Sequence, residues 1–117
     1  MNAPEPCRLM RIHIGADDRF QGRTLYMEIL DRCRQANIEM VTVYRGIAGY
    51  GASTRIHRPG LLGRSKDAPI VVTVLDTVEK IQGLLPMLND IVDEGLIAIS
   101  KAEVIRYGKV DSTHVRY

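Results

Sequence analysis

The sequence predicts an α+β domain in which two helices cover one face of a four-stranded antiparallel sheet. Two segments repeat apolar residues every three or four positions, as amphipathic helices do. Four other segments show the alternation or the β-branched content that is typical of strands. The elements follow each other in the order βαββαβ, and right-handed crossovers place both helices on the same face of the sheet. We therefore expect the ferredoxin-like arrangement.

The first strand and the first helix come from the opening third of the chain. Residues 8–14 alternate, with apolar side chains on one face and Arg11 and His13 on the other, so they are expected to form a strand. Residues 24–36 show helical spacing, and Thr24 is a suitable residue to cap the start of that helix. Together these segments form the first βα unit.

Two further strands are predicted on either side of a long connection. Residues 40–44 and residues 69–75 are rich in β-branched or aromatic side chains. The second of these segments is mostly apolar on both faces, with Ile70, Val72 and Val74 on one side and Val71, Thr73 and Leu75 on the other. A half-exposed strand alternates with polar residues, so we expect the sheet to be covered on one face by its own helices and on the other by another subunit.

The second helix and the fourth strand complete the domain. Asp76 and Glu79 stand at the spacing of a capping box, and the apolar stripe that follows them ends at Gly95. Residues 97–107 return to alternation and predict the fourth strand. The two βα units are thus each followed by a strand, as the ferredoxin-like order requires.

The length of 117 residues suits one domain. We expect it to span residues 8–107, with a disordered tail at 1–7 and a polar tail at 108–117. No apolar run approaches the roughly 20 residues of a membrane span, and the first residues do not resemble a secretory signal. Cys7 and Cys33 are too few for a disulfide framework, so we expect reduced thiols and a cytoplasmic location.

Glycine and arginine are concentrated in residues 45–58, which read RGIAGYGASTRIHR. Glycines admit positive φ and let backbone N–H groups approach a ligand closely. Residues 40–66 contain no carboxylate, so their arginines can bind the phosphate or carboxylate oxygens of a ligand. A flexible connector with solvated arginines is the alternative interpretation. The predicted ligand-binding residues are Arg45, Gly46, Gly49, Tyr50, Gly51, Arg55, His57 and Arg58.

Beside this glycine stretch, the chain contains KDAPIVVTVLDT, EKIQGLLPMLNDIVDEG and EVIRY. Over residues 8–107, the four stretches together resemble the uncharacterised PII-like family, relatives of the nitrogen regulatory PII signalling proteins. The resemblance implies a homotrimer of ferredoxin-like subunits, with a loop at residues 46–65 that contacts a target protein such as a membrane transporter or an enzyme. It also implies an adenine-nucleotide site in the cleft between subunits, although DEGLIAI lacks the glycine, aspartate and lysine signature that holds ATP phosphates in PII proteins.

Three alternative functions follow from these features. The first is a non-enzymatic signalling protein that binds a small anionic ligand, an adenine nucleotide by resemblance, and signals through residues 46–65. The second is an RNA-binding module, although the first and third strands offer no aromatic side chains on which bases could stack. The third is an enzyme of unknown type, which the lack of a legible arrangement of serine, histidine and acid disfavours.

The sequence gives no support for a metal centre. His13, His57, His114, Cys7 and Cys33 show no spacing that is typical of metal ligands. We therefore expect no metal, no catalytic residue, no cofactor apart from an adenine nucleotide as effector, and no nucleic-acid partner.

Overall fold

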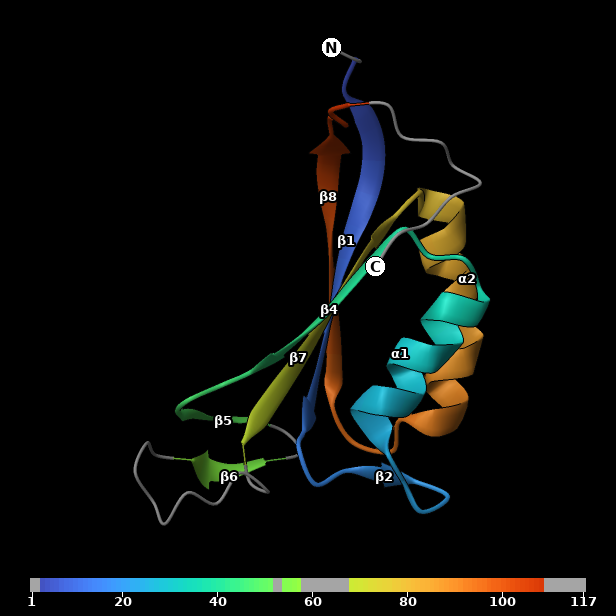
Figure 1. Cartoon of the computed structure of the whole chain (residues 1–117). Coiled ribbons are helices and arrows are strands. Elements are labelled where there is room, and N and C mark those ends of the chain that lie inside the picture. The colour runs from blue at the N-terminus through green and yellow to red at the C-terminus, as the bar shows by residue number, and fades with distance from the viewer. Residues whose placement is uncertain (1–2, 52–53, 58–67, 109–117) are drawn as a thin grey trace.

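The protein folds as a four-stranded antiparallel sheet with two helices, as a computed structural model shows for residues 3–51, 54–57 and 68–108 (Figure 1). The strands lie in the order β4-β7-β1-β8, and each is antiparallel to its neighbours. Their bounds are Glu5–Gly15 for β1, Met40–Arg45 for β4, Pro69–Asp76 for β7 and Leu96–Val104 for β8. The helices are α1, Leu25–Gln35, and α2, Val78–Ile91. This order confirms the predicted ferredoxin-like fold.

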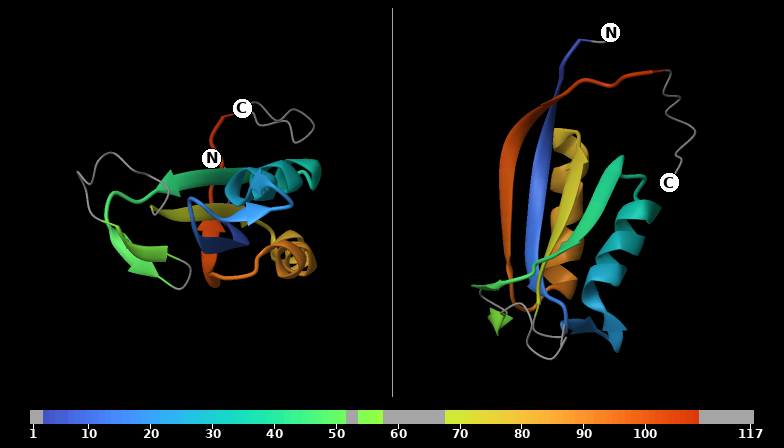
Figure 2. Two further views of the ribbon diagram at one scale, coloured as in Figure 1. Left: turned by 90° about the horizontal axis from the view of Figure 1, so that it is seen from below. Right: turned by 60° about the vertical axis from the view of Figure 1, so that its left-hand side comes forward.

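The core lies between the sheet and the two helices, which cover the same face (Figure 1 and Figure 2). Ile12 of β1 and Val72 and Val74 of β7 point into this layer and are 0% exposed. Ile29 of α1 and Ile81 of α2 are also 0% exposed and close the layer from the helix side. Full burial of one such side chain stabilises the fold by about 1.5–3 kcal/mol, so this layer supplies the main driving force for folding.

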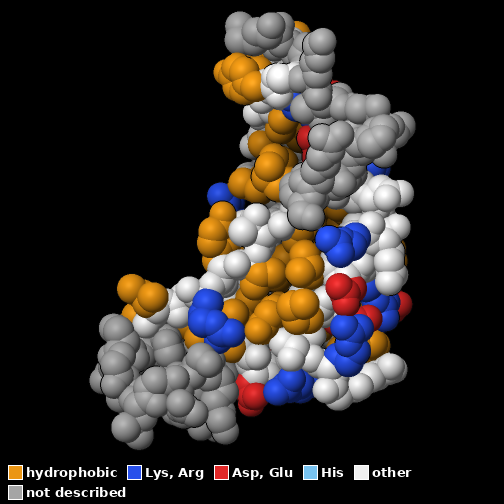
Figure 3. Space-filling model, viewed as in Figure 1, with side chains coloured by type: hydrophobic (Ala, Val, Ile, Leu, Met, Phe, Trp, Pro, Cys, Tyr) orange, Lys and Arg blue, Asp and Glu red, His pale blue; other side chains and the backbone are white. Residues whose placement is uncertain are grey.

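On the opposite face of the sheet, the described part of the chain places no helix. We call it the open face and define it by nine residues of three strands: Leu9, Arg11 and His13 of β1, Met40, Thr42 and Tyr44 of β4, and Val71, Thr73 and Leu75 of β7. Met40 and Tyr44 are 48% and 56% exposed. In Figure 3, hydrophobic side chains run along the strands, whereas charged side chains gather over α1. A second subunit over the open face stays a prediction.

The sheet begins earlier in the chain than the alternation predicts. Glu5 pairs with Val104 and Cys7 with Ala102, so residues 5–7 belong to β1 although we expected them in a disordered tail. The expected strand over 97–107 is instead β8, which ends at Val104. Beyond it, Arg106 Nε donates to Glu39 Oε2 at 2.7 Å, and the same guanidinium also contacts Glu5. These hydrogen bonds raise the pKa of Arg106 and fix the segment that follows the sheet.

The start of α2 differs from the predicted capping box. Thr77 is the N-cap residue, and its hydroxyl accepts a hydrogen bond from the Lys80 backbone N–H at 3.3 Å. Asp76 is buried and accepts instead from the backbone N–H groups of Glu39, at 2.8 Å, and of Thr77, at 2.7 Å. Its carboxylate therefore joins the start of β4 to the end of β7, because it satisfies backbone donors of both segments.

Two short hairpins interrupt the predicted βαββαβ order. The first joins β2, Arg19–Phe20, to β3, Arg23–Thr24, through Gln21 and Gly22. Both turn residues have positive φ, 49° and 81°, as in a type I′ turn. The second hairpin pairs β5, Gly49–Gly51, with β6, Thr54–His57, inside the segment for which we expected a loop. Among the described residues, no helix is long and apolar enough to cross a membrane.

Candidate functional site

The predicted binding segment starts where β4 ends against the beginning of β7. Arg45, the last residue of β4, pairs with Ile70. The Gly46 N–H then donates to the Pro69 carbonyl at 2.7 Å, which continues the pairing by one step. From the first strand, the Ala16 N–H donates to the Ala68 carbonyl at 2.9 Å. Three segments thus meet at one end of the sheet and form what we call the loop base.

Glycine is required at this end of the sheet for reasons of space and of backbone conformation. A Cβ atom at Gly46 would lie 2.6 Å from Cγ of Pro69, which is closer than real Cβ atoms come to their neighbours. Gly49 has a φ of 151°, a value that side chains other than glycine rarely adopt. The positive φ at Gly49 is one that the sequence analysis expected of this stretch, whereas the close approach at Gly46 is to Pro69, and approach to a ligand stays a prediction.

Arg45 is held at the loop base by a residue that the sequence analysis did not single out. Its Nη2 donates to the Tyr26 hydroxyl at 3.3 Å, and its guanidinium lies 6.0 Å from the centroid of the same ring. Tyr26 belongs to the first turn of α1, so the helix sets the position of an arginine at the end of β4. Such a contact between a cation and an aromatic face is worth about 0.5–1 kcal/mol at an exposed site.

The other predicted site residues lie further along the segment. Tyr50 in β5 is 81% exposed, and Gly51 pairs with Thr54 across the hairpin. Arg55 and His57 belong to β6, whose backbone pairs with β5, while their side chains lie outside the described part of the chain. Arg58 also lies outside the described residues. The structure therefore places Gly46 and Gly49 at Pro69 and Arg45 beside them, paired with Ile70, while ligand binding by all eight residues stays a prediction.

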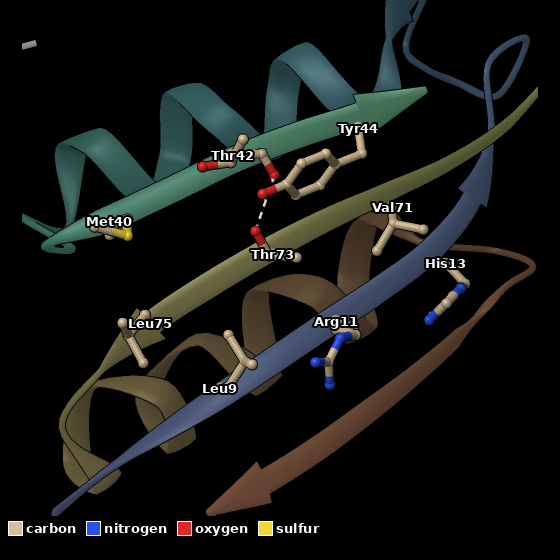
Figure 4. Close-up of a pocket in the computed structure, with 9 residues that line it drawn as sticks. All are labelled: Leu9, Arg11, His13, Met40, Thr42, Tyr44, Val71, Thr73 and Leu75. Carbon is tan, nitrogen blue, oxygen red and sulfur yellow. Dashed lines mark hydrogen bonds between the residues drawn. The ribbon is translucent and has the colours of Figure 1, made fainter. Parts of the chain in front are cut away.

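A second feature is a shallow hollow of about 490 Å³ over the open face, lined by the nine residues that define it (Figure 4). The strand register arranges them in three rows across the sheet. One outer row contains Tyr44, Val71 and His13, and the other contains Met40, Leu75 and Leu9. The middle row, Thr42, Thr73 and Arg11, is entirely polar. The hollow is thus an apolar surface that is crossed by one polar strip.

The two cysteines are poor candidates for chemistry. Both are free and buried, and burial raises the pKa of the Cys33 thiol to about 11. Burial is also the main cause that raises the pKa of Cys7, with a smaller contribution from Glu5. A thiol of raised pKa is protonated near neutral pH and therefore a weak nucleophile and metal ligand. Among the described residues, no group of histidines, cysteines and acids could hold a metal ion.

Comparison with known proteins defines the class first. Residues 7–104 match the family model DUF190, described as "Uncharacterized ACR, COG1993", and the chain belongs to this family. A "UPF0166 protein" of Aquifex aeolicus is 35% identical over 98 residues, which cover 84% of this chain and 92% of the relative. A second UPF0166 protein, from Methanocaldococcus jannaschii, is 28% identical over 100 residues and covers 85% and 92% of the two chains.

Solved structures then relate the fold to PII-like proteins. A PII-like protein of Thermus thermophilus superimposes with a TM-score of 0.66 at 12% identity, covering 89% of this chain and 94% of that one. CPII of Thiomonas intermedia, "a nitrogen regulatory PII-like protein", gives a TM-score of 0.59 at 17% identity and covers 89% and 92%. That structure is described as bound to ADP, AMP and bicarbonate. The resemblance to PII-like proteins is confirmed at the level of the fold.

Proposed function

We propose that this protein is a non-enzymatic, PII-like signalling protein of the cytoplasm. In this proposal it assembles as a homotrimer and binds a small anionic ligand, an adenine nucleotide, in the cleft between subunits. Residues 46–65 then transmit the bound state to a target protein such as a transporter or an enzyme. A ligand shifts such a segment only as far as its affinity differs between the two forms, so nucleotide contacts to the segment are part of the proposal.

The observation that carries this proposal is the geometry of the loop base. Arg45 contacts Tyr26 there through a hydrogen bond to the hydroxyl and a cation–π contact with the ring. The next residue, Gly46, packs directly on Pro69. The planar guanidinium of an arginine is suited to bind phosphate oxygens bidentately. The related fold of CPII is described with ADP and AMP bound, which supports an adenine nucleotide as the anion.

Assembly through the open face is supported by its composition. Leu9, Val71 and Leu75 are only partly buried there. Met40 and Tyr44, on β4 at the edge of the sheet, are more exposed. Exposed apolar side chains in two rows, on either side of a polar strip, mark an interaction site more often than a solvated face. A copy of the chain is the occupant that the PII-like fold favours.

The nucleotide site is tested by calorimetric titration of the trimer with AMP, ADP and ATP. We expect wild type to bind at least one of them and Arg45→Ala to bind it about 10- to 150-fold more weakly, because a charge-assisted hydrogen bond contributes about 1.5–3 kcal/mol. Arg34→Ala is the control, since Arg34 lies exposed at the end of α1, in the last helical turn. Equal affinity of Arg45→Ala and wild type would remove the loop base from the site. A short RNA in the same titration tests the alternative class.

A further inference from the structure

The polar strip across the open face has no acidic counterpart. Register pairs Arg11 with Thr73 on one side and with Ala98 of β8 on the other, and Thr73 with Thr42. Arg11 is one of the residues that line the hollow, and in Figure 4 its side chain leaves β1 on the side away from β7. The nine residues of the open face include a guanidinium and an imidazole but no carboxylate. The face therefore carries positive charge only.

Acidic side chains elsewhere in the described chain do not neutralise Arg11. No carboxylate of the described residues lies within ion-pair distance of its guanidinium, whereas Glu5 and Glu39 pair with Arg106. Asp76, at the end of the adjacent strand, is buried and engaged by backbone N–H groups. As far as the described residues go, solvent balances the charge of Arg11, and Arg11 loses that solvent when another subunit covers the face.

Identical subunits cannot supply the missing charge from the same surface. In a closed ring that meets through the open face, each copy brings another Arg11 and no acid of that face. A buried charge without a partner is strongly unfavourable, and like charges in a dry interface repel each other. The outer rows nevertheless favour burial, because five of their six residues are aliphatic or aromatic side chains of Leu, Val, Met and Tyr. Both tendencies are satisfied if an anion lies between the copies.

We propose that the open face binds a small oxyanion between subunits, with Arg11 as its main ligand; this inference rests on the homotrimer of the proposed function. The guanidinium matches two oxygens of a sulfate, phosphate or carboxylate group. The hydroxyls of Thr42 and Thr73 lie in the same row and provide neutral donors. The Thr73 hydroxyl donates to the Thr42 carbonyl at 3.3 Å, which is long for an O–H···O hydrogen bond, so it can turn to an anion at little cost.

This site differs from the nucleotide site at the loop base. Arg45 pairs with Ile70, whose side chain is buried on the helix-covered face, whereas Arg11 belongs to the open face. The oxyanion on the open face is accordingly a part of the assembly, and the nucleotide is the proposed signal. Loss of one need not remove the other.

The test measures trimer association by sedimentation in chloride, sulfate and phosphate at equal ionic strength and fixed pH. We expect sulfate or phosphate to tighten wild-type association by about tenfold or more, the effect of one charge-assisted hydrogen bond. Arg11→Met keeps the length of the side chain without its charge, and it should associate equally well in all three salts. Thr73→Val should lower the dependence on anions in part. Arg34→Met, which removes an exposed charge on α1, should behave as wild type.

The outcomes separate this inference from the proposed function. A wild-type trimer that is indifferent to the anion, together with dissociation of Arg11→Met, would show that an acid of a neighbouring subunit pairs with Arg11 and would overturn the oxyanion site. A trimer of equal affinity in every salt for wild type and both variants would also overturn it, while homotrimer formation stands. A wild-type monomer in every salt at micromolar concentration would overturn the trimer and the oxyanion site together. Circular dichroism of each variant confirms that it is folded.

Discussion

The helix-covered face and the open face are formed by the same strands and contain similar apolar residues, but these residues differ in how far they are buried. In β7, Val72 and Val74 are 0% exposed beneath the helices, while Val71 and Leu75, one position away, stay partly exposed. The central rows of the covered face, around Val72 and Val74, are apolar, whereas a threonine and arginine strip divides the open face. The hydrophobicity of the residues alone therefore does not tell which face of the sheet forms the core. The polar middle row distinguishes the face that we propose for assembly.

The most severe test places the same charge on either side of β7. Val72→Asp buries a carboxylate in the dry helix layer, where nothing can pair with it, and we expect loss of the folded state, at a cost of several kcal/mol. Val71→Asp puts the carboxylate on the open face, and we expect a folded subunit that no longer forms trimers. Circular dichroism reports the fold and light scattering the mass.

The paired design makes the result decisive. Unfolding of both variants would show that the open face is needed to form the subunit itself, so the two faces would not differ as described. A Val71→Asp protein that keeps the wild-type mass would instead remove the open face from the assembly.

A milder version of the same comparison uses truncation. Ile81→Ala leaves a cavity in the helix layer and should lower the free energy of unfolding by about 2–5 kcal/mol, since Ile81 is 0% exposed. Met40→Ala, at a residue 48% exposed on the open face, should lower it by less than about 1 kcal/mol at high dilution. Urea denaturation at several protein concentrations separates folding from association, because only the second depends on concentration. A larger loss for Met40→Ala at high dilution would contradict the comparison.

Two glycines in the second half of the chain test how tightly the sheet is packed at the end that holds the loop base. A Cβ atom at Gly95 would lie 2.5 Å from the His13 carbonyl oxygen, and Gly95 has a φ of 151°. We expect Gly95→Ala to destabilise the protein by about 1–3 kcal/mol. The control is Gly83→Ala in α2, where a Cβ meets nothing within 4 Å and should stabilise the helix by about 0.5–1 kcal/mol. Thermal unfolding measures both, and equal shifts of the two variants would show that this end is loosely packed.

The main elements could be predicted because each has a strong pattern of its own. Four strands and two helices follow from local alternation or helical spacing, and their order leaves few topologies. The hairpins were missed because strands of two to four residues give too little pattern to detect. At the start of α2, Asp76 and Thr77 are both good capping residues, and only the backbone of Glu39, 37 positions away, decides which one caps.

The candidate site was predictable only where composition reports it. Glycines and arginines pointed to residues 45–58, and the structure places Arg45, Gly46 and Gly49 at one base. Tyr26 was missed because its contact with Arg45 spans 19 positions and joins a helix to a strand end. The polar row of the open face was missed for the same reason, since register brings together residues of three strands.

The smallest expected effect comes from removing the hydroxyl of Tyr26. This change tests whether the contact of Tyr26 with Arg45 matters for nucleotide binding more than a tyrosine hydroxyl on the open face does. Tyr26→Phe keeps the ring beneath the guanidinium but removes the hydroxyl that accepts from Arg45 Nη2 at 3.3 Å. Because this hydrogen bond from the guanidinium is long and exposed, we expect it to contribute only about 0.5–1.5 kcal/mol, so nucleotide affinity should fall by roughly 2- to 12-fold, less than for Arg45→Ala. Tyr44→Phe is the matched control, because Tyr44 lies on the open face, next to Arg45 in β4. Calorimetric titration of both variants with the best nucleotide decides the matter: equal losses would assign the ligand to the open face, and no loss in either would show that Arg45 needs no support from α1.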